Sequence, residues 1–437
     1  MKTINGMPEL AAAQAEVQQY RQRLDGLLLY SGAFQTAVGE TFLALLDALQ
    51  VEDAALSQRR YAAWFQALAS TGTGWGTHLL WQIAYAENPF TAQAQSTSYG
   101  DLPPALVAAA RHDLEQLQAL HQLSGAQVAG WVQAIAHLPE PPVAWTVAET
   151  SPSPLPLPPQ APWAEAVAEL AAHYRRYGAG LFAQYRAFSW RSGALCGIAD
   201  PDPIGLGQLT AYDYPRQQLV QNTLALLKGY PALNVLLYGS RGSGKSSLVK
   251  ALVNEYAPQG LRLVEVAKGD LQALPQIVGD LKSRPQKFII FVDDLSFEED
   301  DDTFKSLKVV LEGSTTARPT NVVVYATSNR RHLVREFFSD RPRPSDQDDV
   351  QAWDTMQEKL SFSDRFGLTL TFEPADQPTY LVIVRHLATQ AHIPLPDDDL
   401  TARALQWATR HNGRSGRAAR QFIDWLTAEL GLAIGSV

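Results

Sequence analysis

The sequence has a single cysteine, no long hydrophobic run and no excess of basic residues. One cysteine cannot form an intrachain disulfide, so Cys196 is interpreted as a small core residue of a cytoplasmic protein. No apolar run approaches the roughly 18 residues of a membrane-spanning helix, and none typical of a signal peptide follows Met1. A membrane partner is therefore not expected. The net charge of −9 argues against a broad nucleic-acid surface, although a local basic patch would be compatible with it.

The length of 437 residues suits two or three domains. Residues 1–150 predict an all-helical N-terminal domain, because apolar residues recur there at spacings of three and four. Members of this pattern are Leu10, Ala13, Val17, Tyr20, Leu24, Leu27, Phe34, Val38, Phe42, Leu45 and Leu49. The region contains no catalytic motif, so a structural role and the binding of a protein partner stay equally open.

A proline-rich stretch follows this region. Its density of proline over residues 151–163 predicts a semi-rigid spacer, with a proline-rich ligand for a recognition domain as the alternative. Residues 164–201 predict a helical connector with one apolar face. That face contains Val167, Leu170, Tyr174, Tyr177 and Leu181.

After residue 201, short β-type apolar runs alternate with helical segments. The runs are Asn234–Tyr238, Leu261–Val266, Phe288–Val292, Asn321–Tyr325 and Leu368–Phe372. This alternation predicts an α/β fold with a parallel five-stranded sheet over residues 202–374. Residues 375–437 predict a small helical domain.

The segment Gly239–Ser246 fits the pattern G-x-x-x-x-G-K-[ST] of a phosphate-binding loop. Its glycines allow backbone N–H groups to curl toward phosphate oxygens. Lys245 is expected to reach the β- and γ-phosphates of ATP, and the Ser246 hydroxyl to ligate Mg²⁺. A strand before the loop and an amphipathic helix after it favour this interpretation over a Gly/Ser-rich turn. The expected phosphate-binding residues are Gly239, Ser240, Arg241, Gly242, Ser243, Gly244, Lys245, Ser246 and Ser247.

The third apolar run ends at Asp293, and a carboxylate at the end of such a strand lies beside a phosphate-binding loop, where it can hold Mg²⁺. Asp294 is the first candidate for orienting the attacking water, with a turn or cap role as the alternative. Glu298 and Glu299 are further candidates for that water. They belong to an acidic run that is otherwise interpreted as a solvated helix start rather than a metal site.

Asn329 follows the fourth apolar run, where an amide can contact the γ-phosphate or the water. In this order the motifs resemble the AAA+ superfamily of P-loop ATPases, over residues 202–432. The resemblance implies that Asn329 and Arg417 sense the γ-phosphate and that Arg365 completes the ATP site of a neighbouring subunit. Arg417 would otherwise belong to a solvated basic stripe on a helix. Arg365 would otherwise form an ion pair within its own chain, for instance with Glu358.

Three stretches carry a narrower resemblance. They are Asn234–Gly239, Val292–Glu298 and Leu360–Gly367, which are similar to a bacterial AAA+ family of unknown function whose members are described as ATP-binding. Arg365–Leu370 is similar to the replication-initiator and helicase-loader branch. Ala267–Pro275 lacks the aromatic residue of the pore loop of threading unfoldases, and no helix-turn-helix domain follows the expected helical lid.

The resemblance implies ATP hydrolysis by a homo-oligomeric ring or filament, coupled to remodelling or switching of an unknown macromolecular partner. A protein client would bind the N-terminal domain, and the adenine would lie near Leu209–Tyr212. One alternative is a nucleotide-gated scaffold with little turnover, favoured by Asp294 in the position that usually holds Glu. The other is a helicase-loader-like, DNA-linked ATPase, which the acidic charge disfavours.

Overall fold

The computed structural model describes residues 7–147, 155–158, 160–296, 303–312, 319–329, 364–411 and 413–434. The chain divides into two compact units. Met1–Gln184 is called the helical unit below, and Tyr185–Val437 is called the sheet unit.

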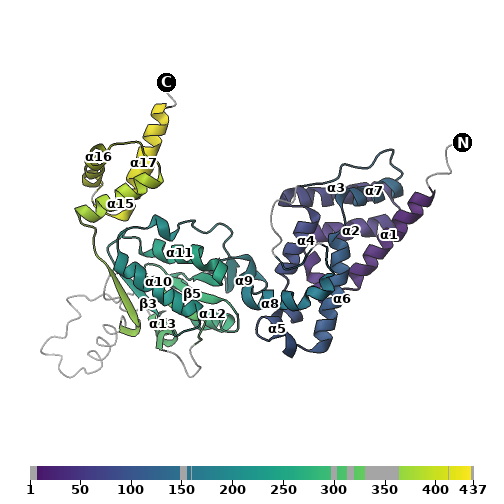
Figure 1. The fold of residues 1–437 in the computed structure, drawn as a ribbon, viewed down its shortest axis with the longest axis horizontal. Coiled ribbons are helices and arrows are strands. Elements are labelled where there is room, and N and C mark those ends of the chain that lie inside the picture. The colour runs from purple at the N-terminus through teal and green to yellow at the C-terminus, as the bar shows by residue number, and fades with distance from the viewer. Residues whose placement is uncertain are drawn as a thin grey trace. The chain divides into compact units, whose positions relative to one another are not determined.

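The helical unit packs α-helices and short 3-10 turns around one apolar core (Figure 1). Its helices are α1 (Met7–Asp25), α2 (Ala37–Val51), α3 (Ala54–Thr71), α4 (Trp75–Ala84), α5 (Pro89–Ala94), α6 (Pro104–His121), α7 (Gly125–Ile135), α8 (Val167–Tyr177) and α9 (Leu181–Gln184). The 3-10 turns are Tyr30–Phe34, Tyr99–Asp101 and Trp163–Ala166. The predicted apolar faces are buried, as Val17, Phe42 and Leu45 illustrate. The helical N-terminal region is thereby confirmed.

The proline-rich stretch differs from the expected spacer. Leu155 and Leu157 are buried in the core of the helical unit, together with Trp163. The Trp163 indole N–H donates to the Pro158 carbonyl at 3.1 Å, and its backbone N–H donates to Gln118 on α6 at 3.0 Å. This part of the stretch is therefore packed against the helices.

The helical connector predicted for residues 164–201 ends with α9, because strands β1 (Ala187–Arg191) and β2 (Ala194–Gly197) follow it. They form an antiparallel hairpin. Its turn residues Ser192 and Gly193 have φ angles of 51° and 82°, the conformation that two-residue hairpin loops need. Cys196 lies on β2 and is exposed, so its interpretation as a core residue was wrong.

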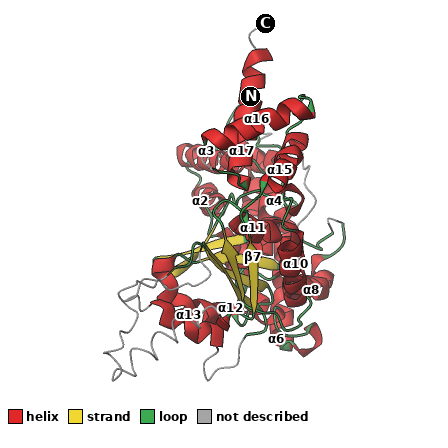
Figure 2. Cartoon of the chain, turned by 90° about the vertical axis from the view of Figure 1, so that its left-hand side faces the viewer, coloured by secondary structure: helices red, strands yellow, loops and turns green. Residues whose placement is uncertain are grey.

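The sheet unit contains a seven-stranded sheet with the order β2-β1-β4-β5-β6-β3-β7. Figure 2 draws its strands in yellow. The five predicted strands are present as β3 (Val235–Gly239), β4 (Leu261–Glu265), β5 (Lys287–Val292), β6 (Val322–Ser328) and β7 (Leu368–Phe372). They are parallel to their neighbours, and β1 adds a further parallel pairing to β4. The α/β class is confirmed, whereas the predicted number of five strands was too small because the β1–β2 hairpin was missed.

Helices cover both faces of this sheet (Figures 1 and 2). α10 (Asp213–Leu227) and α11 (Lys245–Tyr256) lie on one face, and α12 (Leu274–Leu281) and α13 (Thr303–Glu312) lie on the other. Short 3-10 turns connect them at Leu206–Gln208, Ala257–Gln259 and Lys268–Ala273. Val235 and Leu237 share a core with α10 and α11. Because the strands are parallel, the polar residues after β3, β5 and β6 meet at one edge.

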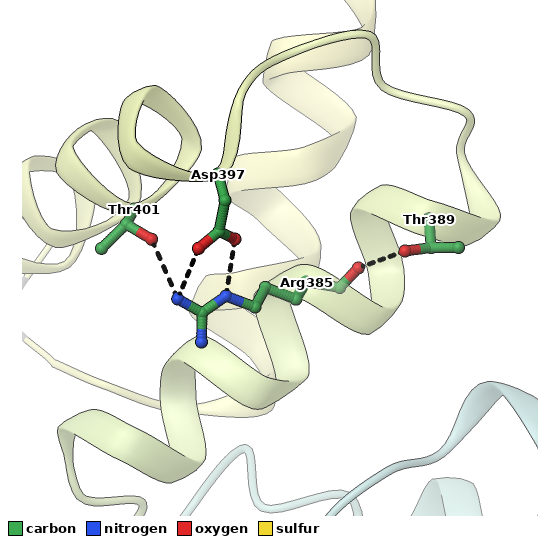
Figure 3. Close-up of polar contacts among 4 residues, drawn as sticks. All are labelled: Arg385, Thr389, Asp397 and Thr401. Atoms are coloured by element: carbon green, nitrogen blue, oxygen red, sulfur yellow. Dashed lines mark hydrogen bonds and ion pairs between the residues drawn. The ribbon is translucent and has the colours of Figure 1, made fainter.

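The lid is formed by α15 (Gln377–Gln390), α16 (Asp397–Arg410) and α17 (Gly416–Ile434), as expected for a small helical domain. It has its own apolar core around Tyr380, Ala404 and Phe422. On its surface, Arg385 on α15 pairs with Asp397 at the start of α16 at 2.6 Å (Figure 3). None of the helices in the described part of the chain combines the length and apolar character that crossing a membrane requires.

Candidate functional site

The predicted phosphate-binding loop connects β3 to α11, as the motif requires. Gly239 lies against β7 so closely that a Cβ atom there would be 1.9 Å from the Phe372 carbonyl oxygen. Ser240 donates its backbone N–H to that same oxygen at 3.2 Å. No side chain fits at residue 239 without displacing β7, so the glycine is a steric necessity.

Lys245 begins α11 and is 6% exposed. Its Nζ donates to the carbonyl oxygens of Gly239 at 3.0 Å and Ser240 at 2.8 Å. It also lies 3.4 Å from Oδ1 of Asn329. Burial lowers the pKa of this ammonium, while the carboxylates of Asp293 and Asp294 oppose that shift. The lysine is thus a partly desolvated cation inside the loop, where it is strongly attracted to an anion.

Asp293 directly follows β5, and its Oδ1 accepts a hydrogen bond from the Ser246 hydroxyl at 2.7 Å. The same oxygen accepts from the Thr327 hydroxyl at 2.5 Å. A carboxylate beside a hydroxyl suits Mg²⁺, which prefers oxygen ligands and is usually held by one or two carboxylates together with phosphates and waters. Among the described residues no group of three or more His, Cys, Asp or Glu side chains is placed to hold a metal. The pair Ser246–Asp293 fits this ion better than a site built from protein ligands alone.

Asp294 and Asn329 lie together at the edge of the sheet. The Asn329 side-chain amide donates to Oδ1 of Asp294 at 2.7 Å, and its oxygen faces Lys245. Asn329 therefore connects the loop lysine to the candidate for orienting water. Glu298 and Glu299, the further candidates, lie outside the described residues.

A cavity of about 570 Å³ opens over these groups, within the size range of small-molecule sites. Its walls come from the loop, the ends of β5 and β6, the segment before α10, and the lid. It is lined by Ile204, Gln208, Leu209, Thr210, Tyr212, Arg241, Gly242, Ser243, Gly244, Lys245, Ser246, Ser247, Asp293, Asp294, Thr327, Asn329, Ile383, Leu387, Gly416, Arg417, Arg420 and Gln421.

Apolar and aromatic residues of the cavity wall include Leu209, Tyr212, Ile383 and Leu387. The first two belong to the segment where the adenine is expected. The chain just before this segment is held to the lid, because the Gly207 carbonyl accepts hydrogen bonds from two side chains of α15. The donors are His386 at 2.9 Å and Gln390 at 3.1 Å. The far end of the segment is fixed to the sheet by the Tyr212 hydroxyl, which donates to the Glu373 carbonyl at 2.8 Å.

The start of α17 packs directly on the loop. The backbone N–H of Arg417 donates to the Gly242 carbonyl at 3.2 Å. A Cβ at Gly242 would lie 3.0 Å from the Ser415 hydroxyl, and Gly242 has a φ of 75°. The side chains of Arg417 and Arg420 line the cavity. Both arginines are also exposed, so the role of this basic stripe at a phosphate site stays a prediction.

Arg365 is half-buried before β7 and is absent from the cavity wall. Glu358, its suggested partner in the chain, lies outside the described residues. The structure also brings in residues that sequence reasoning missed, among them Thr327 from β6 and Gln421 from α17. Thr327 could have been found, because it lies two residues before Asn329 and strand side chains repeat their direction every two residues.

A family profile described as "Protein of unknown function (DUF815)" matches residues 183–430. No curated protein matches the chain. Among solved structures, the chain is similar to the RuvB Holliday junction branch migration motor of Thermotoga maritima, with 13% identity over 51% of this chain and 72% of that one and a TM-score of 0.31. A single-residue variant of that motor has 14% identity, the same coverage and a TM-score of 0.32.

Proposed function

The chain belongs to the family described as protein of unknown function (DUF815). We propose that its sheet unit is an AAA+ P-loop module that binds ATP with Mg²⁺ and hydrolyses it. The observation that carries this proposal is the hydrogen bond of 2.7 Å between Ser246 and Asp293. Ser246 directly follows the loop lysine and Asp293 ends a separate strand, so the contact joins a phosphate-binding loop to a carboxylate that can share a cation with it.

The phosphates would lie at the N-terminus of α11, where backbone N–H groups and the helix dipole favour an anion. Lys245 would exchange the carbonyls of Gly239 and Ser240 for phosphate oxygens. Ser246 and Asp293 would hold Mg²⁺, which neutralises charge on the transferred phosphoryl group. The adenine would lie against apolar residues of the cavity wall such as Leu209 and Leu387.

For hydrolysis, Asp294 would orient the attacking water and accept its proton. Asn329 would hold Asp294 on one side and sense the γ-phosphate on the other. Arg417 would approach the same phosphate from the lid. These roles are supported by the shared cavity wall and by the contact between Asn329 and Asp294.

A nucleotide-gated scaffold with little turnover is the second candidate. The residue that favours it is Asp294, whose side chain is one methylene shorter than that of the usual Glu. In that case ATP would bind and change the lid without being consumed rapidly.

The assembly and partner are further parts of the proposal. A homo-oligomeric ring or filament would bring Arg365 of one subunit to the ATP site of the next, which agrees with its absence from the cavity wall of its own chain. A cytoplasmic protein client would bind the helical unit and be remodelled or switched. A DNA-linked role like that of a helicase loader would require binding to single-stranded DNA that weakens with salt.

Phosphate release from ATP by purified protein tests the proposal. The wild type and a Lys250→Ala variant should turn over alike, because Lys250 lies on α11 outside the cavity wall. Lys245→Ala should lose the activity. Equal activity in Lys245→Ala and wild type would overturn the proposal, and ATP binding without turnover in the wild type would favour the scaffold.

A further inference from the structure

Thr327 lies near the end of β6 and is 2% exposed, yet it lines the cavity. Its hydroxyl donates to Oδ1 of Asp293 at 2.5 Å and accepts the backbone N–H of Asp294 at 2.9 Å. Its carbonyl oxygen accepts the backbone N–H of Leu295 at 2.7 Å. One residue of β6 therefore contacts three consecutive residues after β5.

These contacts determine which oxygen of Asp293 accepts hydrogen bonds from the protein. A threonine hydroxyl has one hydrogen to donate, and here it goes to Oδ1. That oxygen also accepts from the Ser246 hydroxyl and from the Asp294 backbone N–H at 3.2 Å. Oδ2 accepts no hydrogen bond from any residue that the structure describes. The carboxylate is thus held by one oxygen, which orients the other.

The backbone at Asp294 is also unusual. Its φ of 51° lies in the left-handed region, which is unfavourable for most residues but is visited more often by Asp and Asn. The kink points the Asp294 side chain toward Asn329, and the chain then returns to β6 through Leu295. The bond from the Asp294 N–H to the Thr327 hydroxyl stabilises this kink. The same geometry gives a physical reason for Asp in a position that usually holds Glu.

We propose that Thr327 is a positioning residue that holds both acids of the ATP site, fixing the carboxylate of Asp293 for the cation and the backbone of Asp294 for the water. The inference deepens the proposed function and rests on it. Thr327 itself touches neither the phosphates nor the water in this account. Its hydroxyl, and not its methyl group, carries the effect.

Thr327→Ser and Thr327→Ala give the matched comparison, because both lose the methyl group and only Ala loses the hydroxyl. Thr327→Val keeps the size of the side chain and also loses the hydroxyl. ATP affinity without Mg²⁺ should stay within about twofold of wild type in all three variants, because Lys245 and the loop are intact. In Thr327→Ala and Thr327→Val, the ATP affinity measured with Mg²⁺ and the kcat should each fall by about 10–100-fold, as for loss of other groups that orient metal ligands.

Thr327→Ser should keep most of both quantities. If these two quantities fall as far in Thr327→Ser as in Thr327→Ala, the methyl group and its packing matter instead of the hydroxyl, and the inference is wrong. It is also wrong if Ala and Val keep the Mg²⁺ dependence and kcat of the wild type. ATP affinity in EDTA reports folding of the site in each variant. Failure of the proposed function is a separate result, since then the wild type itself would neither bind nor hydrolyse ATP.

Discussion

In the helical unit, the Asp113 carboxylate is completely buried and accepts backbone N–H groups of Leu28, Leu29 and Tyr30 at 2.7–3.1 Å. In the sheet unit, the Asp293 carboxylate also accepts several hydrogen bonds, from Ser246 among others, but it is exposed to a cavity. Both acids are held by donors. Only the second is placed where a ligand can reach it.

Other polar groups of the helical unit are hydrogen-bonded inside the fold, as Asp113 is. The Trp75 indole N–H donates to the Leu120 carbonyl at 2.7 Å, and the Tyr174 hydroxyl donates to the Ile83 carbonyl at 2.6 Å. Such bonds satisfy buried backbone groups and stabilise the fold. The contrast is that polar groups of the candidate site in the sheet unit face a cavity, whereas these polar groups of the helical unit bond to the backbone of their own fold.

The largest effect on turnover is expected from Arg365→Ala. In enzymes that use an arginine from a neighbouring subunit it contributes roughly 10³–10⁵ in rate, so kcat should fall by at least about 10³-fold while ATP affinity is kept. Specific activity of the wild type should rise with protein concentration. Mixing Arg365→Ala with Lys245→Ala should restore some activity, because one mixed interface pairs an intact loop with an intact arginine.

If Arg365 instead stabilises its own chain, Arg365→Ala should lower the melting temperature, leave activity per folded molecule unchanged and gain nothing from mixing. Activity independent of concentration, with a monomeric mass by light scattering in ATP, would also contradict the role between subunits.

Asp113→Ala should lower the stability of the helical unit and leave the ATP affinity of the candidate site unchanged. Leaving a buried N–H group without an acceptor costs about 1–3 kcal/mol. The bond from Tyr30 is buried and those from Leu28 and Leu29 are part-buried, so a loss of at least about 1 kcal/mol of unfolding free energy is expected. Urea unfolding followed by tryptophan fluorescence measures it, with Asp25→Ala as an exposed control. Below the transition, ATP affinity should equal that of the wild type. A loss of affinity there would mean that the two units are coupled.

Asp294→Asn sharpens the comparison within the sheet unit. Turnover should fall by about 10²-fold or more, as for loss of a general base, while ATP stays bound. Single-turnover assays and calorimetry measure the two quantities. Should Asp294→Asn keep its turnover and Glu298→Gln lose it, the water would be oriented further along the chain.

The smallest effect is expected at the lid surface, where Arg385 pairs with Asp397 in Figure 3. The two side chains are 47% and 59% exposed, and water screens such pairs. Arg385→Ala should leave both the urea midpoint and ATP affinity unchanged within error. A clear change in either would show that the position of the lid depends on this pair.

The position of the candidate site residues could be predicted where a short segment contains both a strand and the polar residues that follow it, while the roles of these residues stay predictions. Gly239–Ser246 and Asp293 combine a strand, a turn and the reactive groups within a few residues, so local patterns suffice. Contacts between distant segments were not predictable in the same way. The packing of Arg417 on Gly242 depends on how the lid contacts the loop. The resemblance implied only that Arg417 lies near the phosphates, and it did not predict this contact.

Two parts of the fold were missed for different reasons. β1 and β2 follow directly on a strong helical pattern, although the pair Ser192–Gly193 is a readable hairpin signal. Leu155 and Leu157 carried no such signal, because proline-rich chain exposes or buries its apolar residues according to what lies beside it. Their burial is decided by the helices of the helical unit.

Calorimetric titration of ATP into wild type and Lys245→Ala tests the central claim, that the cavity binds a nucleoside triphosphate through its phosphates. The wild type should bind one ATP per chain, and more tightly with Mg²⁺ than without it. Lys245→Ala should show no measurable binding, because the charge-assisted contact to the phosphates is lost. An unchanged dissociation constant in Lys245→Ala would contradict the account.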